Sequence, residues 1–563
     1  MKVVIVGGVA GGATAAARIR RLDEKAEIVV FERSGYISYA NCGLPYYIGG
    51  AITDAEELTL QTPQSFFSRF RVDMRVRHEV TAVHPDKKTV SVRNLTTGEE
   101  FEEKYDKLIL SPGAKPTQPR LPGAGIRKVF TLRTVEDTLR IKEYINENNP
   151  RSAILAGGGF ISLELAENLR ELGMEVTIVQ RPKQLMNPFD ADMAAFIHGE
   201  MRKHGIKLML GHTVEGFEEK DGGVDVLLKD EEPLHGDMVV LAIGVTPDSS
   251  LAKDAGLELG VKGSIVVNER METSVPDIYA VGDAVQVKHY VTGEDSVISL
   301  AGPANKQGRI AADNICGGDS RYLGSQGSSV IKVFNMTAAT TGINETNAKK
   351  AGLNVDKVIL SPMSHAGYYP GGKVMTMKVV FEKETYRLLG AQIVGYEGVD
   401  KRIDVLATAI HAGLKAARLK DLDLAYAPPY SSAKDPVNMA GFMIDNIAKG
   451  TLKQWFIEDE PNLPRDGSVT LLDTRTVGEY SRGHVDGFKN IPVDELRERL
   501  GEIEMGKPVY VICQSGLRSY IACRILDGNG YEAYNFAGGF RFYDTVTNDR
   551  CMIEQAAPCG MDK

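Results

Sequence analysis

Two of the six cysteines lie in segments whose neighbouring residues suit sulfur chemistry. Cys42 is in SYANCGLPYYIGG, residues 38–50, and Cys513 opens the loop CQSGLRS, residues 513–519. Neither belongs to a Cys-x-x-Cys pair. Each is therefore expected to react with an external sulfur, through a mixed disulfide or a persulfide, or to cycle through a sulfenic acid.

A glycine-rich turn follows the first apolar run, KVVIV at 2–6, and opens a predicted helix over 13–22. The next strand ends at Glu32. A β–turn–α–β unit of this kind places a dinucleotide pyrophosphate on helix N-terminal N–H groups, and the acid accepts hydrogen bonds from ribose hydroxyls. Val9 departs from a strict G-x-G-x-x-G pattern. The predicted contacts are Gly7, Gly8, Gly12, Glu32 and Arg33.

The same unit returns about 150 residues later, in SAILAGGGFIS. Its predicted dinucleotide contacts are Gly157, Gly159, Ser162, Glu164, Gln180 and Arg181. An acid at the end of the second strand would favour NADH through the ribose 2′-hydroxyl, but Gln180 stands there, followed by Arg181. NADPH is therefore allowed, and NADH is not excluded.

The motifs of residues 1–445 resemble, in kind and order, those of the two-dinucleotide-binding-domain flavoprotein reductases. Residues 1–32, LILSPGA (108–114) and TSVPDIYAVGDA (273–284) together resemble that family's FAD-binding signature, and LAGPANKQGR (300–309) would lie near the flavin and substrate. The resemblance implies FAD contacts at Ala114, Asp283 and Ala301, with NADH or NADPH at the second turn.

The segment around Cys42 closely resembles the single-cysteine coenzyme A-disulfide reductases. In that family the cysteine forms a mixed disulfide with coenzyme A. Carried over by matching positions, the substrate-binding residues would be Thr14, Arg18, Arg21, Ser38, Asn41, Arg69, Arg71 and Asn305. Two further loops, HAGYYPGG (365–372) and AYAPPYSSAKDP (425–436), resemble tyrosine loops that reach the cysteine of the partner subunit, which implies a homodimer. The tyrosines expected to hydrogen-bond or protonate the leaving thiolate are Tyr368 and Tyr426, with Tyr430 in reserve.

LLDTRTVGEYSRGHVDGFKNIP (471–492) resembles the opening of a rhodanese domain. The loop from Cys513 to Arg518 would surround the sulfur with backbone N–H groups at a helix N-terminus, stabilising a thiolate or persulfide. Its four intervening residues are fewer than the five of the phosphatase loop, so it suits sulfur better than phosphate. Asp473 and Arg475 are expected to act as internal braces. A catalytically silent rhodanese fold used for binding is the alternative.

The predicted fold class is α/β, with two Rossmann-like domains, an α+β dimerisation domain and a C-terminal α/β rhodanese domain. The expected boundaries are 1–112 with 250–324 for FAD, 113–249 for NAD(P)H, 325–449 for dimerisation, 450–465 for a linker that holds the single tryptophan, Trp455, 466–552 for the rhodanese domain and 553–563 for a tail. The last dozen residues, which contain Cys551 and Cys559, show no clear element.

The 563 residues carry a formal net charge of −9, which argues against a general nucleic-acid binder. No apolar stretch of membrane-spanning length and no secretory signal is recognised, so a cytoplasmic protein is expected. No metal site is expected.

The predicted function is FAD-dependent reduction of coenzyme A persulfide, polysulfide or disulfide by NAD(P)H, because the fused rhodanese segment and Cys42 belong to one sulfur chemistry. Two alternatives remain open. One is an NADH oxidase or peroxidase that uses a Cys42 sulfenic acid, and the other is a non-catalytic sulfur carrier or sensor.

Overall fold

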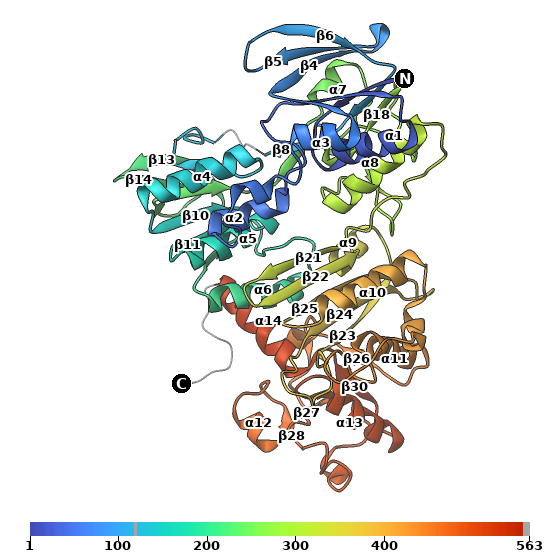
Figure 1. Ribbon diagram of the computed structural model, residues 1–563. Helices are drawn as coiled ribbons and strands as arrows, with labels where there is room; N and C mark the ends of the chain where they lie inside the picture. The colour runs from blue at the N-terminus through green and yellow to red at the C-terminus, as the bar shows by residue number, and fades with distance from the viewer. Residues whose placement is uncertain (118–120, 555–563) are drawn as a thin grey trace. The chain divides into compact units, whose positions relative to one another are not determined.

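A computed structural model describes residues 1–117 and 121–554, in two compact units. The first unit comprises Met1–Arg181 and Ile206–Gly327, and the second comprises Pro182–Gly205 and the chain from Ser328 onward (Figure 1). Within the described ranges, no helix has both the length and the apolar character that a membrane crossing requires.

The first parallel sheet has the strand order β18-β7-β1-β2-β3. Its strands are β1 (Lys2–Val6), β2 (Glu27–Glu32), β3 (Asp73–Val76), β7 (Lys107–Leu110) and β18 (Ile278–Ala280). The run VVIV of β1 is buried throughout, as expected for a parallel strand covered on both faces. Helices α1 (Ala10–Leu22) and α8 (Ala301–Ile315) pack against each other beside this sheet (Figure 1).

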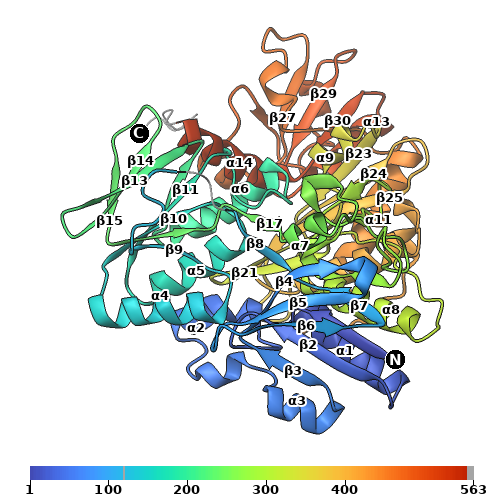
Figure 2. The ribbon, with the colours of Figure 1, turned by 90° about the horizontal axis from the view of Figure 1, so that it is seen from above.

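The second parallel sheet of this unit has the order β12-β11-β10-β16-β9. Its strands are β9 (Val129–Thr131), β10 (Ser152–Ala156), β11 (Glu175–Gln180), β12 (Lys207–Leu210) and β16 (Met238–Leu241). Helix α5 (Phe160–Glu171) follows β10, and the short α2 (Leu44–Gly49) lies against α5 and α4 (Val135–Asn148) (Figure 2). The segment that holds Cys42 therefore packs against the helices beside the second parallel sheet.

Smaller elements complete the first unit. Two antiparallel sheets consist of β4 (His78–His84), β5 (Thr89–Asn94) and β6 (Glu100–Lys104), and of β13 (Val214–Lys220), β14 (Gly223–Leu228) and β15 (Leu234–Gly236). Two strand pairs are β8 (Ala114–Pro116) with β17 (Val245–Pro247), and β19 (Val287–Lys288) with β20 (Asp295–Ser296). The remaining helices are α3 (Pro63–Phe70) and α7 (Ser250–Asp254).

The second unit contains an antiparallel sheet with the order β21-β22-β25-β24-β23. Its strands are β21 (Ser329–Val333), β22 (Met336–Gly342), β23 (Val355–Leu360), β24 (Thr376–Glu382) and β25 (Leu388–Gly395). The helices of this part are α6 (Ala191–Lys203), α9 (Glu345–Lys350), α10 (Val399–His411) and α11 (Pro436–Ala448). This is the α+β part that the change of pattern after residue 325 predicts.

A parallel sheet with the order β26-β30-β29-β27-β28 closes the chain. Its strands are β26 (Gln454–Trp455), β27 (Thr470–Asp473), β28 (Lys489–Asn490), β29 (Val509–Ile512) and β30 (Ala533–Phe536), with helices α12 (Val477–Ser481), α13 (Leu517–Gly528) and α14 (Gly539–Glu554). The alternating strands and helices confirm the predicted α/β class.

Two expectations for this region are corrected. Trp455 is not in a plain linker, since β26 pairs with β30 and the indole is 2% exposed between Phe488 and Phe536. Cys551 is not in a loose tail, because α14 continues to Glu554 and buries it. Cys559 and most of the expected tail, 553–563, lie outside the described residues.

Candidate active sites

The first glycine turn leaves no room for side chains. Gly7 has φ +97°, in the left-handed region, and a Cβ on Gly12 would lie 1.9 Å from the Gly7 carbonyl oxygen. No side chain caps the following helix at Val9, and its first turn carries no acid. The N-terminal N–H groups of α1 are thus available to an anion, which fits the pyrophosphate of a dinucleotide.

Glu32 ends β2 as predicted, and its carboxylate is 8% exposed. It accepts hydrogen bonds from the N–H groups of Gly8, at 2.8 Å, and Ser34, at 2.9 Å. Glu32 therefore stabilises the conformation of the first glycine turn. Arg33 beside it is exposed and pairs with Asp248 at 3.1 Å.

The other predicted FAD contacts lie at the ends of elements in the same unit. Asp283 lies three residues after β18 and forms an ion pair with Arg133, at 2.7 Å. Ala114 begins β8 and is buried, whereas Ala301 is the exposed first residue of α8. Arg133 was missed from the sequence, since it comes from a distant segment that carries no motif.

The second glycine turn contains one tight contact and one open position. Gly157 has φ +119°, and a Cβ there would lie 2.2 Å from the Ala242 carbonyl oxygen. At Gly159, the uncapped N-terminus of α5, a Cβ would meet no described protein atom within 4 Å. The hydroxyl of Ser162 is buried without a hydrogen-bond partner among the described residues. An open, uncapped helix end beside an unpaired hydroxyl fits a second dinucleotide.

The residues predicted to choose between NADH and NADPH follow this helix along the chain. Gln180 is the last residue of β11, and the exposed Arg181 comes directly after it. The described chain thus confirms their place at the end of the strand, where the ribose 2′-position is read.

Cys42 lies exposed in a short 3₁₀ turn, Asn41–Gly43, immediately before α2. Desolvation raises the pKa of its thiol, the Glu164 carboxylate raises it further, and Arg133 opposes them. Ser38 has φ +44°, and its N–H donates to the Gly8 carbonyl oxygen at 2.9 Å. This bond ties the cysteine segment to the first glycine turn.

Glu164, predicted as a nicotinamide-site acid, has a second property that the sequence does not show. Burial raises the pKa of this carboxyl to about 7, and the neighbouring Glu167 adds to the rise, while a hydrogen bond from Tyr46 opposes it. Helix α5, which carries Glu164, packs against α2, which follows Cys42. The Glu164 carboxyl therefore changes its charge near neutral pH within electrostatic range of the Cys42 thiol.

Three residues predicted to bind substrate share one face of α1, at positions i, i+4 and i+7. The Thr14 hydroxyl donates to the Asn305 Oδ1 at 2.5 Å, so these two candidates lie side by side. Arg18 pairs with Asp313 of α8 at 2.7 Å, and Arg21 is exposed at the end of the helix.

Arg69 and Arg71, the other two predicted substrate-binding arginines, are at the end of α3 and not on α1. Arg69 is exposed in the last turn of α3, and Arg71 follows the helix with φ +49°. The Arg71 guanidinium lies 5.2 Å from the Phe67 ring centroid. Arg20, which was not predicted, is the buried arginine of α1, and it donates five hydrogen bonds to backbone carbonyls that include those of Phe70 and Arg71.

The tyrosine loops of the second unit meet each other. The hydroxyls of Tyr368 and Tyr426 are 2.7 Å apart, and this hydrogen bond raises the pKa of Tyr426. Tyr430 is 71% exposed. Arg402, 1% exposed and absent from the sequence predictions, holds both loops, since its guanidinium donates to the Ser364 carbonyl oxygen at 2.9 Å and to that of Tyr430 at 3.3 Å.

Cys513 is buried at the end of β29, and its loop leads into α13. Its sulfur accepts hydrogen bonds from the Gly516 N–H, at 3.1 Å, and the Ser519 hydroxyl, at 3.2 Å. Both donors would stabilise a negative sulfur. Gly516 has φ +94°, a conformation that turns its N–H back toward the sulfur and suits glycine.

Arg518, at the end of this loop, is paired with a carboxylate. Its guanidinium makes two 2.7 Å bonds to Glu479, which also caps α12. These bonds lower the pKa of Glu479 to about 2. The predicted brace is present, since Asp473 and Arg475 form a buried ion pair at 2.7 Å.

Comparison with known proteins agrees with this geometry. The pyridine nucleotide-disulphide oxidoreductase model matches residues 1–308, its dimerisation-domain model 328–436 and the rhodanese-like domain model 460–544. The coenzyme A disulfide reductase of Staphylococcus aureus strain JH9 is 37% identical over 442 residues, which are 78% of this chain and 99% of that protein.

Two solved structures are similar over nearly the whole chain. Reduced Bacillus anthracis CoADR-RHD is 49% identical, with a TM-score of 0.95 and 98% of each chain covered. An NAD-dependent persulfide reductase from A. fulgidus is 38% identical, with a TM-score of 0.91, covering 96% of this chain and 100% of that one.

Two dinucleotide turns, an isolated cysteine beside the first and a buried sulfur loop in a rhodanese-like sheet define a flavoprotein oxidoreductase that acts on sulfur. Its cofactors are FAD and a nicotinamide dinucleotide. The chain belongs to the pyridine nucleotide-disulphide oxidoreductase family.

Proposed function

We propose that the chain reduces coenzyme A disulfide and coenzyme A persulfide or polysulfide with NAD(P)H, through a mixed disulfide between Cys42 and coenzyme A. The observation that carries the proposal is the exposed, free Cys42, in the segment that Ser38 ties to the first dinucleotide turn. A sulfur centre with no internal partner needs an external thiol to complete its cycle. The named relatives support coenzyme A as that thiol.

The proposed reaction balances as follows. The Cys42 thiolate attacks one sulfur of coenzyme A disulfide, and the second coenzyme A leaves as its thiolate. With a persulfide, hydrosulfide leaves instead and the same Cys42 mixed disulfide forms. Two electrons from NAD(P)H then break that disulfide, so that NAD(P)H and one proton yield NAD(P)⁺ and two thiols, or one thiol and hydrogen sulfide. FAD, when bound, supplies the two-electron path between the nicotinamide and the sulfur.

The residues around the first turn have proposed roles in holding coenzyme A. Arg21 and the outer part of Arg18 would contact its phosphates, because guanidinium groups pair well with phosphate oxygens. Thr14 and Asn305 would line the same face, joined by their hydrogen bond. Ser38 and Asn41 would flank the thiol end, and Arg69 and Arg71 would add peripheral positive charge.

Tyr368 and Tyr426 are proposed to serve Cys42 of the partner subunit, with Tyr430 near them. A hydrogen-bonded phenol pair can donate to a leaving thiolate. The matched dimerisation domain supports a homodimer, and the exposure of both phenols in one chain is consistent with a role at a partner.

Cys513 is proposed to carry persulfide sulfur in the rhodanese-like region and deliver it toward coenzyme A. NADPH and NADH both remain candidate donors, because Gln180 does not repel a 2′-phosphate. The domain boundaries predicted above and a cytoplasmic location complete the proposal.

Three serine substitutions test it. Cys42→Ser should abolish NADPH- or NADH-dependent reduction of coenzyme A disulfide, whereas Cys316→Ser, at a half-buried cysteine after α8, should retain it. Cys513→Ser should keep disulfide reduction and lose only the handling of a sulfur donor such as thiosulfate. Full turnover in Cys42→Ser would refute the mechanism, and oxygen consumption in place of acceptor reduction would favour the oxidase.

A further inference from the structure

The helix α6 and the loop before it belong to the second compact unit, although they lie in the chain between two strands of the second parallel sheet. Strand β11 ends at Gln180 and β12 begins at Lys207, whereas Pro182–Gly205 packs with the chain after Ser328. We call residues 182–205 the α6 segment. Its first residues follow Gln180 and Arg181 directly, so its conformation bears on the residues predicted to read the dinucleotide ribose.

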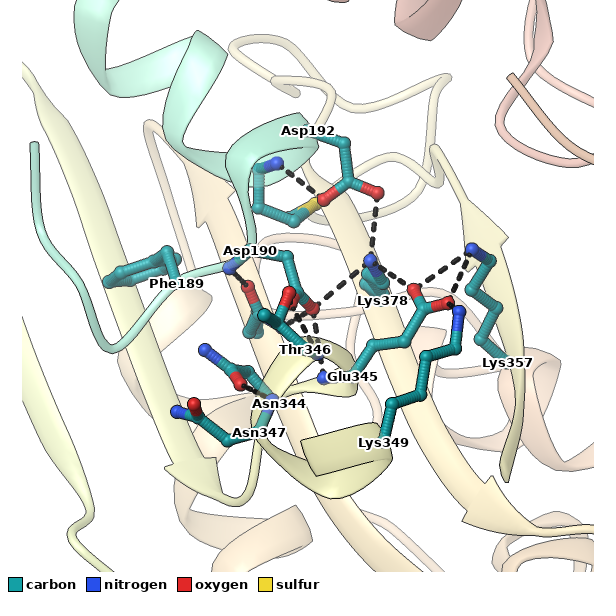
Figure 3. A network of polar contacts seen from close by, with 12 residues as sticks. Phe189, Asp190, Asp192, Asn344, Glu345, Thr346, Asn347, Lys349, Lys357 and Lys378 are labelled. Atoms are coloured by element: carbon teal, nitrogen blue, oxygen red, sulfur yellow. Dashed lines mark hydrogen bonds and ion pairs between the residues drawn. The ribbon is translucent and has the colours of Figure 1, made fainter. Parts of the chain in front are cut away.

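One end of the α6 segment is fixed by the buried polar network in Figure 3. Asp190 accepts hydrogen bonds from the N–H groups of Glu345, at 3.0 Å, and Thr346, at 2.9 Å. Lys378, 1% exposed, pairs with Asp192 at 2.7 Å, with Glu345 at 2.8 Å and with Asp190 at 3.1 Å. The start of α6 is thereby held to the antiparallel sheet.

The other anchor comes from the last helix of the described chain. Helix α14 packs against α6 (Figures 1 and 2), and its Asp549, 5% exposed, accepts a 2.8 Å hydrogen bond from Nδ1 of the fully buried His198. Arg202 adds a 2.5 Å bond to the second carboxylate oxygen. The opposite ring nitrogen, Nε2, receives the Leu185 N–H at 2.9 Å.

These contacts determine the tautomer of His198. A backbone N–H can only donate, so Nε2 is the acceptor and carries no proton. Nδ1 then carries the proton and donates it to Asp549. Asp549 of α14, the His198 ring and the Leu185 N–H thus form one ordered chain of hydrogen bonds. It ends five residues after Gln180, inside the loop Pro182–Phe189.

The far end of the loop is held from outside by Asn344, whose side-chain amide donates to the carbonyl oxygens of Asn187, at 3.4 Å, and Pro188, at 3.2 Å. The His198 contact at Leu185 lies nearer to Gln180. Met186 has φ +53°, and within the loop the Phe189 N–H donates to the Met186 carbonyl oxygen at 2.9 Å. The match to the staphylococcal relative spans 442 residues and covers 99% of that protein. That protein is therefore too short to contain both the matched reductase and a counterpart of α14. The Asp549 contact is therefore a feature of the longer chain rather than a requirement of the family reaction.

We propose that Asp549 and His198 are positioning residues for the nicotinamide dinucleotide. By holding the Leu185 N–H they fix the part of the loop that lies nearest to Gln180 and Arg181, so helix α14 contributes to dinucleotide affinity without touching the dinucleotide. The proposal rests on the proposed function only in taking this strand end as the NAD(P)H site.

The test compares variants of the full, FAD-loaded protein. The dissociation constants of NADP⁺ and NAD⁺ are measured by calorimetry without any sulfur substrate, and KM and kcat are measured with coenzyme A disulfide. Asp549→Ala should weaken dinucleotide binding and raise the KM for NAD(P)H by about three- to tenfold, the range of one hydrogen bond, with kcat nearly unchanged. Asp549→Asn keeps an acceptor for His198 and should restore most of the affinity. Arg550→Ala, at an exposed residue of α14, is the control.

Unchanged dissociation constants in Asp549→Ala would overturn the proposal, as would a fall in kcat without a change in KM. Asp549→Ser, which is too short to reach His198 but keeps a polar group, decides the same question if Asp549→Ala does not fold. If the wild-type protein does not reduce coenzyme A disulfide, the proposed function is contradicted. The positioning role of Asp549 is still tested, because dinucleotide binding is measured separately.

Discussion

The substitution Gly159→Ala, which adds one methyl group, tests whether the second glycine turn binds a dinucleotide or is needed only for packing. Gly159 has φ −93° and ψ −171°, an extended conformation that alanine adopts without strain. The new Cβ would meet no described protein atom within 4 Å. Gly159→Ala should therefore fold normally, and the reduced entropy of the unfolded chain should raise its stability by up to about 1 kcal/mol.

The same methyl group would occupy the space through which a pyrophosphate approaches the N-terminal N–H groups of α5. Losing one charge-assisted hydrogen bond costs about 1.5–3 kcal/mol, which is about 10- to 150-fold in the dissociation constant. We expect that loss for NADPH and NADH alike, with the FAD content unchanged because the first turn is untouched. Calorimetric titration measures the affinity, and thermal denaturation measures the stability.

Gly12→Ala is the matched comparison. Its Cβ would lie 1.9 Å from a backbone oxygen, so this variant should lose both FAD and stability. Unaltered dinucleotide affinity in a stable Gly159→Ala protein would refute the assignment of the second turn.

Three further predictions concern charge and packing. Lys378→Met removes the cation shared by buried carboxylates and should lower the free energy of unfolding by about 3–5 kcal/mol, measured by urea denaturation. Lys349→Met, at a more exposed lysine, should lower it by about 1 kcal/mol or less. Equal losses in the two variants would contradict the argument that burial makes the difference. Glu164→Gln removes a negative charge and should lower the pKa of Cys42, seen as faster alkylation near neutral pH; unchanged rates from about pH 6 to pH 10 would show that the two groups are not coupled. Trp455→Ala should cost about 3–5 kcal/mol in denaturation followed by circular dichroism, whereas a loss below about 1 kcal/mol would restore the view of this segment as a linker.

The parts of the fold that sequence reasoning predicted are those dictated by local geometry. Each glycine turn lies between an apolar strand and a helix, so its pattern is complete within about thirty residues. The same holds for Cys513, whose loop, strand and helix are contiguous. Here the described structure confirms the elements that position Gly157 and Cys513.

The contacts that sequence reasoning missed join segments far apart in the chain. Arg133 reaches Asp283, and Arg402 holds two loops, but neither arginine lies in a motif. Trp455 was misassigned because a two-residue strand is too short to show periodicity and the surrounding acids and prolines resemble a linker. The raised pKa of Glu164 likewise depends on burial between helices, which no spacing reveals.

The most direct test of the central claim is the intact mass of the purified protein before and after reduction, with peptide mapping of the adduct. The mechanism predicts that the oxidised protein carries about one coenzyme A per chain, attached at Cys42 and released by a thiol reductant or by NAD(P)H. An oxidised protein that is active on coenzyme A disulfide but never carries coenzyme A at Cys42, even during turnover, would contradict the mixed-disulfide mechanism.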